Sequence, residues 1–315
     1  MTNKLCMVFG CTGQDGSLIS NSLLRKGYEV LGITRSSKPN YQYLQQLGIN
    51  QSFEIKKIGV EDDLLSFQKL IEFYDPIEIY NLSAQSSVGL SFKEPYNSIK
   101  SIYHQTLILL EATRTIEFNG TIFLAGSSEM FGETKVAADI NHPRKPLSPY
   151  AHAKEASFSL VKQYRRIYNI NCVTGVLFNH ESTLRTDRFV IPKIIKGAIQ
   201  CKKNKTYKLS LGNIDIYRDW GWAEDYVEAM QRITRADKKQ DHVICTGNLT
   251  SLKDFIKKVF DKMDLNWQDH VTINKGNKRP HDILKSFGSP QALKLELDWE
   301  NKKSIEDIIE LLLEG

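Results

Sequence analysis

The chain has few cysteines, and no two of them are spaced as a metal-binding or redox pair. Five occur among 315 residues, at positions 6, 11, 172, 201 and 245. An odd, scattered set without a C-x-x-C pair argues against a disulfide framework and against a zinc site. We therefore expect reduced, mostly buried thiols and no bound metal.

Long apolar runs are also absent. No segment approaches the roughly 18 apolar residues that a membrane-spanning helix requires. The residues Met1 to Lys4 lead directly into an apolar stretch, without the cleavage pattern of a signal peptide. These absences predict a cytoplasmic protein that does not contact a membrane.

Charge of one sign is not concentrated anywhere in the chain. The net charge of +5 is modest, and Lys and Arg are spread along the sequence. The one basic run, residues 202–205, indicates an exposed loop rather than a nucleic-acid site. This balance suits an anionic small molecule at least as well as nucleic acid, so we expect no nucleic-acid partner.

Short β-branched or aromatic runs alternate with helix-length stretches through the first half of the chain. Such alternation predicts an α/β fold, a Rossmann-type doubly wound parallel sheet with a smaller C-terminal substrate lobe. We assign residues 1–178 to the sheet domain, with about 214–250 returning to it, and 179–315 mainly to the lobe. The expected strands are Leu5–Phe9, Glu29–Thr34, Phe53–Ile58, Ile77–Leu82, Thr121–Ala125 and Cys172–Phe178, with a further one at 243–245.

A glycine-rich turn follows the first expected strand. Gly10, Gly13 and Gly16 form G-x-x-G-x-x-G and precede Ser17–Lys26, which has helical periodicity. Glycines in this setting permit a tight turn and close approach of a pyrophosphate to the helix N-terminus. The alternative is a glycine-rich turn without a ligand.

The second expected strand ends in Thr34-Arg35-Ser36-Ser37 rather than in a carboxylate. A guanidinium and hydroxyls would bind a 2′-phosphate, which a carboxylate would repel, so NADP is favoured over NAD. The alternative is that Arg35 is only a surface arginine.

A candidate acid/base site lies midway along the chain. Ser127 and Glu129 end a strand, and Tyr150 and Lys154 lie four apart on one face of a helix that Ser148 would cap. A nearby ammonium stabilises a phenolate, which predicts a lowered pKa for Tyr150 and a role as base. A Y-x-x-x-K pair also occurs by chance in many helices. The pair is informative here because it follows the strand that ends at Ser127 to Glu129, at the edge of the sheet where ligands bind.

These segments resemble the GDP-mannose 4,6-dehydratase family of extended short-chain dehydrogenase/reductases. The matching motifs occur in the family's order from residue 5 to about 230, with a weaker match from 279 to 299. The most specific are Gly13-Gln14-Asp15-Gly16, Phe178-Asn179-His180-Glu181-Ser182 and Arg218-Asp219-Trp220-Gly221.

The resemblance implies how a sugar would lose water. Tyr150 would take the 4-hydroxyl proton while a hydride passes to NADP, with Lys154 holding the phenolate and Ser127 bonding the C4 oxygen. Glu129 would then remove the C5 proton and help water leave from C6. The hydride returns to C6, so the enzyme is a lyase that needs no external reductant.

The resemblance also implies two sets of binding residues and a GDP-sugar substrate. The cofactor set is Gly10, Thr12, Gly13, Gln14, Asp15, Gly16, Arg35, Ser36, Leu82, Ala84, Tyr150 and Lys154. The substrate set is Ser86, Ser128, Asn179, Lys193, Arg218 and Arg279. We interpret His180 as a packed, structural residue because partners at metal-ligand spacing are missing.

Several departures from the family pattern leave the exact sugar open. The chain is short for the family, Val60 stands where an acidic residue is expected, Leu184 replaces a basic residue, and residues 188–192 differ. GDP-mannose, GDP-N-acetylglucosamine and other GDP-sugars remain candidates, in a homodimer or a homotetramer. An epimerase or reductase, or a non-catalytic NADP-binding module, could use the same fold.

Overall fold

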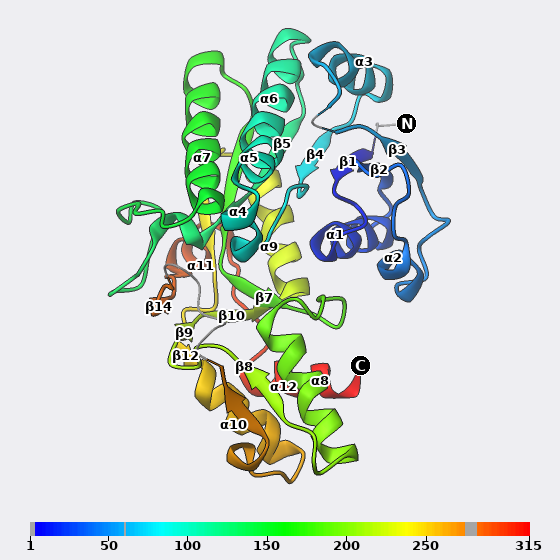
Figure 1. Ribbon diagram of the computed structural model, residues 1–315. Helices are drawn as coiled ribbons and strands as arrows, with labels where there is room; N and C mark the ends of the chain where they lie inside the picture. Colours follow the sequence, from blue (N-terminus) through cyan, green and yellow to red (C-terminus); the bar gives the residue numbers. More distant parts are fainter. Residues whose placement is uncertain (1–3, 60, 275–281) are drawn as a thin grey trace.

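A seven-stranded parallel sheet forms the larger part of the molecule. The computed structural model describes residues 4–59, 61–274 and 282–315. The order of the strands in the sheet is β11-β6-β5-β4-β1-β2-β3 (Figure 1). The chain adds β2 and β3 on one side of β1 and then crosses to the other side with β4, as in doubly wound Rossmann sheets. The strands are β1 Leu5–Phe9, β2 Glu29–Thr34, β3 Glu54–Lys57, β4 Glu78–Asn81, β5 Thr121–Ser127, β6 Cys172–Leu177 and β11 His242–Ile244.

Helices cover both faces of this sheet, which agrees with the largely apolar sequences of β1, β5 and β6 in its interior. One face packs against α1 Gln14–Arg25, α9 Ala223–Arg235 and α11 Gln291–Leu297. The other packs against α3 Leu64–Tyr74, α6 Gln105–Thr115 and α7 Pro149–Tyr168. The predicted fold class is therefore confirmed. Helix α1 begins at Gln14, three residues earlier than expected, because Gly13 in extended conformation already serves as its N-cap.

Short elements connect the sheet to its helices. They are α2 Gln42–Gln46, α4 Val88–Lys93, α5 Pro95–Ile99, the π-helical turn η1 Lys100–His104 and the 3₁₀ turn η2 Ser128–Phe131. The π-helical turn leads directly into α6, and the 3₁₀ turn follows β5 without a break. The 3₁₀ turn contains two of the predicted site residues, Ser128 and Glu129.

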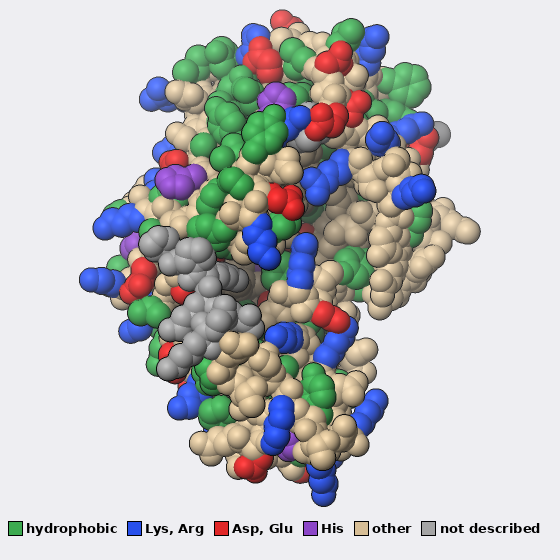
Figure 2. Space-filling view, viewed as in Figure 1, with side chains coloured by type: hydrophobic (Ala, Val, Ile, Leu, Met, Phe, Trp, Pro, Cys, Tyr) green, Lys and Arg blue, Asp and Glu red, His purple; other side chains and the backbone are tan. Residues whose placement is uncertain are grey.

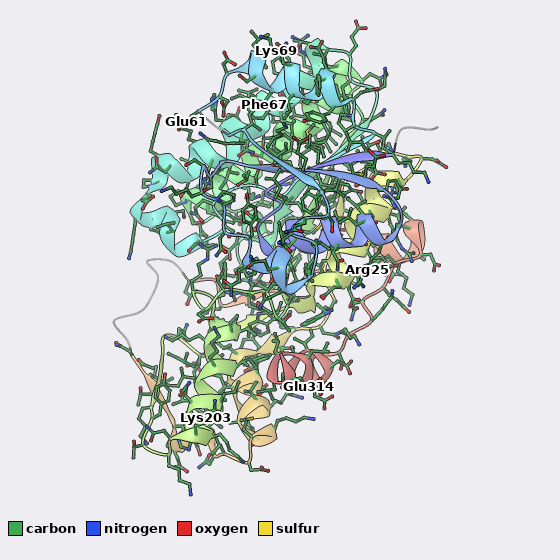
Figure 3. All side chains as sticks on the ribbon, turned by 90° about the vertical axis from the view of Figure 1, so that its right-hand side faces the viewer. Arg25, Glu61, Phe67, Lys69, Lys203 and Glu314 are labelled. Carbon is green, nitrogen blue, oxygen red and sulfur yellow. The ribbon has the colours of Figure 1, made fainter. Side chains whose placement is uncertain are left out.

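A smaller part is built around a separate apolar cluster on three helices, α8 Val190–Lys203, α10 Leu252–Lys262 and α12 Ile305–Glu314. Its short strands are β7 Asn179–Glu181, β8 Leu209–Leu211, β9 Tyr217–Arg218, β10 Trp220–Trp222, β12 Thr250–Ser251, β13 Val271–Ile273 and β14 Lys285–Ser286, with the 3₁₀ turn η3 Trp267–Asp269. In side view, Lys203 and Glu314 lie in this part, away from Arg25 and Phe67 (Figure 3). Because β11, α9 and α11 pack with the sheet, the chain passes between the two parts several times.

The state of the cysteines and the apolarity of the helices can be compared with the sequence. All five cysteines are buried and none is in a disulfide. Within the described ranges, no helix has the length and apolarity needed to cross a membrane.

Candidate active site

The glycine turn brings the backbone of three segments together at the carboxyl edge of the sheet. Gly10 has φ +80°, and a Cβ there would lie 2.9 Å from the backbone of Ser83. A Cβ on Gly16 would lie 2.0 Å from the carbonyl oxygen of Gly10. The backbone N–H of Leu82 donates to Phe9 at 3.1 Å, which holds the end of β4 beside this turn. Only glycine fits this cradle, and the free N-terminus of α1 faces the space that a pyrophosphate would occupy.

The turn after β2 presents polar side chains at the surface. Arg35 and Ser36 are exposed, and the Ser36 hydroxyl accepts from the N–H of Lys38 at 3.1 Å. Among the described residues Arg35 forms no ion pair. Its guanidinium is therefore available to an anionic group at this edge.

Four predicted catalytic residues meet where β5 ends and α7 begins. Ser127 is the last residue of β5 and caps the 3₁₀ turn, accepting from the N–H of Glu129 at 3.3 Å. Ser148 caps α7 by accepting from Ala151 at 3.1 Å, which places Tyr150 in the first helical turn. The side chains of Tyr150 and Ser127 are hydrogen-bonded.

Lys154 lies one helical turn beyond Tyr150. Its Nζ donates to the carbonyl oxygen of Ala125 at 2.6 Å and lies 5.9 Å from the centre of the Tyr150 ring. The ammonium is thus held between the sheet and the tyrosine. The structure brings all four catalytic candidates into one cluster.

The electrostatics of this cluster correct one prediction. Burial raises the pKa of Tyr150 to about 12, with the Ser127 hydrogen bond opposing the shift and the charge of Glu129 adding to it. Burial also lowers the pKa of Lys154 to about 8. The predicted lowering of the Tyr150 pKa is wrong, because desolvation outweighs the opposing effects of the Ser127 hydrogen bond and the charge of Arg185.

His180 is bonded to helix α1 rather than simply packed. Its Nε2 lies 3.0 Å from both carboxylate oxygens of Asp15, and its Nδ1 lies 2.8 Å from the carbonyl oxygen of Phe178. A carbonyl oxygen and a carboxylate can only accept hydrogen bonds, so this geometry favours an imidazole with hydrogen on both ring nitrogens. Burial would lower the pKa of His180, but Asp15 more than offsets this and the pKa is raised.

A second contact joins the same two segments. The hydroxyl of Ser182 donates to the Gln14 side chain at 2.9 Å, and the Gln14 amide donates to Asp15 at 2.9 Å. Burial would raise the pKa of Asp15, but His180 and Gln14 bring it well below its usual range. Asp15 and Gln14, which were predicted to bind cofactor, therefore also anchor the glycine turn to β7.

Sequence reasoning missed an arginine pair in the loop between β7 and α8. The guanidinium of Arg185 lies 3.8 Å from the centre of the Phe189 ring, and that of Arg188 lies 5.0 Å from it. The charge of Arg185 lowers the pKa of both Tyr150 and Asp15, so Arg185 is near the catalytic cluster. In the sequence, the one indication of this role was that Arg185 follows closely after the motif Phe178 to Ser182.

The predicted substrate residues are less closely grouped. Arg218 is 5% exposed and donates to the carbonyl oxygen of Tyr217 at 2.9 Å, with Asp282 3.9 Å away. Asn179 of β7 pairs in register with Trp220 of β10, which follows Arg218 of β9 closely along the chain, but β9 belongs to a different small sheet. Lys193 is exposed and donates to Ser210 at 2.7 Å.

The remaining substrate candidates differ in their burial and contacts. Ser128 is buried beside Glu129, and exposed Ser86 accepts from Arg188 at 3.1 Å. Arg279 and Val60 lie outside the described residues. Figure 2 shows Lys and Arg side chains around a hollow between the two parts of the molecule, which suits an anionic ligand.

The fold and the clustered Ser127, Tyr150 and Lys154 define an extended short-chain dehydrogenase/reductase. Two solved structures share this fold across nearly the whole chain. The dTDP-glucose 4,6-dehydratase of Streptomyces venezuelae, with NAD bound, has a TM-score of 0.86 at 16% identity and covers 99% of this chain and 97% of its own. The UDP-glucose 4-epimerase of Thermotoga maritima, with UDP-glucose, has a TM-score of 0.85 at 19% identity, with 98% and 97% covered.

Sequence comparison identifies the family. The family model described as GDP-mannose 4,6 dehydratase matches residues 7–312. GDP-mannose 4,6 dehydratase 1 of Arabidopsis thaliana is 37% identical over 321 residues, which cover 99% of this chain and 89% of the relative. The chain therefore belongs to the GDP-mannose 4,6-dehydratase family, and the resemblance seen in its motifs is confirmed.

Proposed function

We propose that the protein converts a GDP-hexose, GDP-mannose or a close relative, to its 4-keto-6-deoxy derivative with NADP as cofactor. The family match confirms the expectation of nucleotide-sugar 4,6-dehydration. The observation that carries the mechanism is the position of Glu129, whose backbone N–H is bonded to the hydroxyl of Ser127. A ketoreductase or epimerase needs Ser127, Tyr150 and Lys154 but has no use for a carboxylate at this point.

The residues divide the reaction between two proton-transfer sites. Tyr150 accepts the 4-hydroxyl proton, Ser127 bonds the C4 oxygen, and Lys154 balances the phenolate charge. Once C4 is a ketone the C5 proton is acidic, and Glu129 removes it and delivers a proton to the departing 6-hydroxyl. Tyr150 finally returns its proton to C5, so water is the only loss.

The glycine turn supports a bound dinucleotide, because its backbone is packed so tightly that a Cβ on Gly10 or Gly16 would clash with it, and such a turn lets a pyrophosphate approach the N-terminus of α1. A nicotinamide bound there would supply the reversible hydride transfer that the oxidation at C4 and the reduction at C6 require. The NAD in the Streptomyces venezuelae structure supports a nicotinamide cofactor. The exposed Arg35 and Ser36, with no carboxylate beside them, favour NADP. A homodimer or homotetramer and a cytoplasmic location stay predictions.

Mass spectrometry of the purified protein with GDP-mannose, and then with GDP-N-acetylglucosamine, tests the proposal. Without added cofactor, one of the two sugars is expected to lose the mass of one water. Glu129→Gln is the matched control and should retain the cofactor while losing the dehydration. A product of unchanged mass but altered stereochemistry would indicate an epimerase instead, and cofactor released on denaturation identifies NADP or NAD.

A further inference from the structure

A basic groove lies on the outer side of α7, beside the segment that leads from the 3₁₀ turn η2 into this helix. Three cations, Arg144, Lys162 and Arg166, line it together with one carboxylate, Glu155. Three cations against one carboxylate leave an excess of two positive charges. None of these residues has a part in the reaction proposed above.

Helical spacing brings the groove residues of α7 together. At intervals of four, three and four positions, one face of the helix presents Glu155, Ser159, Lys162 and Arg166. The last three are exposed, so the face is open to small solutes.

Arg144 reaches the same groove from the preceding segment and covers Phe158. Its guanidinium lies 4.4 Å from the centre of the Phe158 ring, and the ammonium of Lys162 lies 5.8 Å from the same point. Nη2 of Arg144 donates to the carbonyl oxygen of Ile140 at 3.0 Å, which fixes the guanidinium in place. Two like charges are thus held close to one ring, and an anion in the groove would offset their repulsion.

Within the described ranges, the three cations of the groove form no ion pair with a carboxylate. The adjacent Arg165 shows what an arginine of this helix does when a carboxylate is near. It is paired with Asp241, with a nitrogen–oxygen distance of 2.5 Å. The charge of the groove therefore favours an anion that comes from outside the chain.

The size and the donors of the groove indicate which anion it suits. Its volume is about 220 Å³, below the roughly 300 Å³ of pockets that hold drug-sized ligands. Arginine binds phosphate as a planar fork and lysine binds it as a point charge, and Ser159 and Gln163 add neutral donors. We propose that the groove binds the phosphate group of a small molecule, either inorganic phosphate or a phosphate ester, and that the bound anion ties the preceding segment to α7.

The position of Arg144 in the chain connects the groove to the candidate active site. Its segment begins after the turn that contains Glu129 and ends at the start of α7, where Tyr150 lies. The N–H of Lys145 in this segment donates to the carbonyl oxygen of Met130 at 3.0 Å. A phosphate that joins the segment to α7 therefore holds the two proton-transfer groups in their relative positions.

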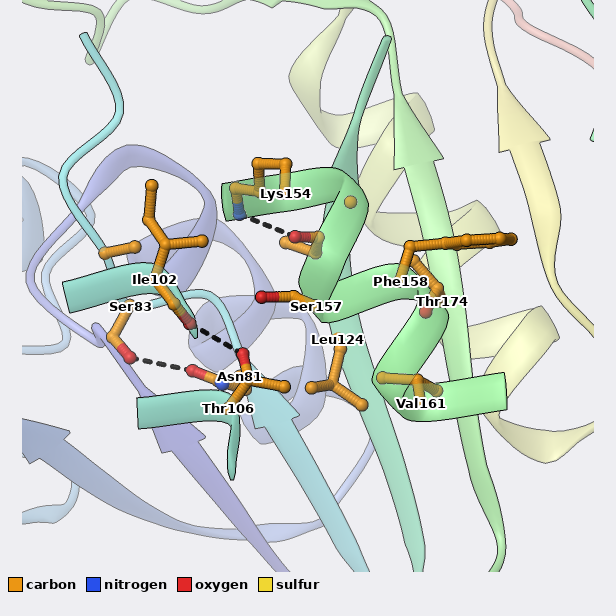
Figure 4. Close-up of a pocket in the computed structure, with 13 residues that line it drawn as sticks. Asn81, Ser83, Ile102, Thr106, Leu124, Lys154, Ser157, Phe158, Val161 and Thr174 are labelled. Carbon is orange, nitrogen blue, oxygen red and sulfur yellow. Dashed lines mark hydrogen bonds between the residues drawn. The ribbon is translucent and has the colours of Figure 1, made fainter. Parts of the chain in front are cut away.

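Phe158 connects the groove to the core beneath it. It is buried in the same apolar cluster as Met130 and Phe131 of the turn η2. In Figure 4 its side chain extends from α7 beside Thr174 of β6, so it also borders the small cavity between this helix and the sheet. The groove is therefore backed by the cluster that supports the turn carrying Glu129.

Phosphorus NMR tests the proposal by titration of the purified protein with inorganic phosphate and, separately, with glycerol phosphate. Ionic strength is held constant, and excess GDP occupies the predicted diphosphate positions of the active site. Lys162→Ala should weaken binding about three- to fivefold, the scale of one exposed charge contact. Glu155→Gln removes the opposing charge and should tighten binding about two- to threefold. Lys69→Ala, at an exposed position of α3, is the matched control and should change nothing.

The two groove variants are expected to act in opposite directions, so a general loss of folding cannot imitate the result. Equal affinity for both probes would show that the phosphate group alone is recognised, whereas tighter binding of glycerol phosphate would show that the groove takes an ester. Affinity that is unchanged in both Lys162→Ala and Glu155→Gln overturns the proposal. Binding no tighter than that of chloride does so as well.

Hydrogen exchange measures the second part of the proposal without any sugar. Phosphate should slow the exchange of backbone amides in residues 133–147 in the unmodified protein and in Lys69→Ala, but much less in Lys162→Ala. Exchange that saturating phosphate leaves unchanged would reject the connection to α7. Neither measurement uses turnover of a GDP-hexose, so a failure of the proposed function and a failure of this inference are distinguishable.

Discussion

The carboxyl edge of the sheet and the smaller part of the molecule position their candidate site residues in different ways. At the sheet edge, Ser127 ends a strand and Tyr150 begins a helix, so local backbone structure places both groups. In the smaller part, Arg218 and Lys193 are held by carbonyl groups of distant segments. The first arrangement is rigid and visible in short motifs, whereas the second depends on how remote strands meet. Substrate choice can therefore vary while the chemistry stays constant.

The largest effect should come from breaking the catalytic edge at Glu129. Glu129→Gln keeps the size of the side chain but removes its basicity, and we expect kcat to fall by roughly 10² to 10⁴. Because Ser127, Tyr150 and Lys154 remain, reduced cofactor should accumulate when the sugar is added, which absorbance can follow. Normal turnover in this variant would remove Glu129 from the mechanism.

The glycine turn should be nearly as sensitive. In Gly16→Ala the new Cβ would lie 2.0 Å from the carbonyl oxygen of Gly10, so we expect a loss of about 2 to 3 kcal/mol in the free energy of unfolding and loss of bound cofactor. Gly89→Ala is the control, since its nearest contact would be 3.9 Å away. Chemical denaturation and cofactor release measure both. Equal behaviour of the two variants would contradict the close approach.

The His180–Asp15 ion pair, which joins the two regions, should have an intermediate and pH-dependent effect. The Asp15 side chain is 22% exposed, so the ion pair is weaker than a fully buried one. We therefore expect His180→Asn to lower the free energy of unfolding by about 2 kcal/mol. The pKa of His180 is raised, so its stabilisation is complete below the ordinary value of 6.5 and is lost as pH rises through the folded-state pKa. The pKa of Asp15 is lowered, so its part is present above 3.8 and is lost only in stronger acid.

Urea unfolding of His180→Asn and of the unmodified protein, at about pH 5.5 and again in alkaline buffer, measures this difference. The gap should shrink in the alkaline buffer. His152→Asn, on the exposed side of α7, provides a matched change that should have no such dependence. A gap that is the same at both pH values would show that His180 stabilises the protein by packing alone.

The smallest effect on activity is expected from a substitution in the smaller part of the molecule. Lys193 is exposed, so its contact with a diphosphate would be weak, and Lys193→Ala should raise KM for the GDP-hexose about two- to fivefold with little change in kcat. Lys196→Ala, one turn away and paired with Asp187 at 2.5 Å, is the control. A fall in kcat without a change in KM would place Lys193 in the chemistry rather than in binding.

The sheet could be predicted closely because most of its strands are short runs of apolar or β-branched residues. β1 and β2 have the expected bounds, and the other expected strands differ by a few residues at their ends. The start of α1 was less predictable, because Gly13 caps it through backbone conformation and not through a side chain. The catalytic cluster was predictable for the same local reason, since strand ends and helix starts in such a fold meet at one edge.

The sequence by itself determined the parallel sheet, the glycine cradle and the set of Ser127, Glu129, Tyr150 and Lys154, because these depend on backbone preferences over a few residues. Only the tertiary structure decided that His180 meets Asp15, 165 positions away, and that Arg185 approaches Tyr150. It also decided that burial raises the pKa of Tyr150. Burial and long-range contact are set by the packing of the whole chain, and no short segment contains them.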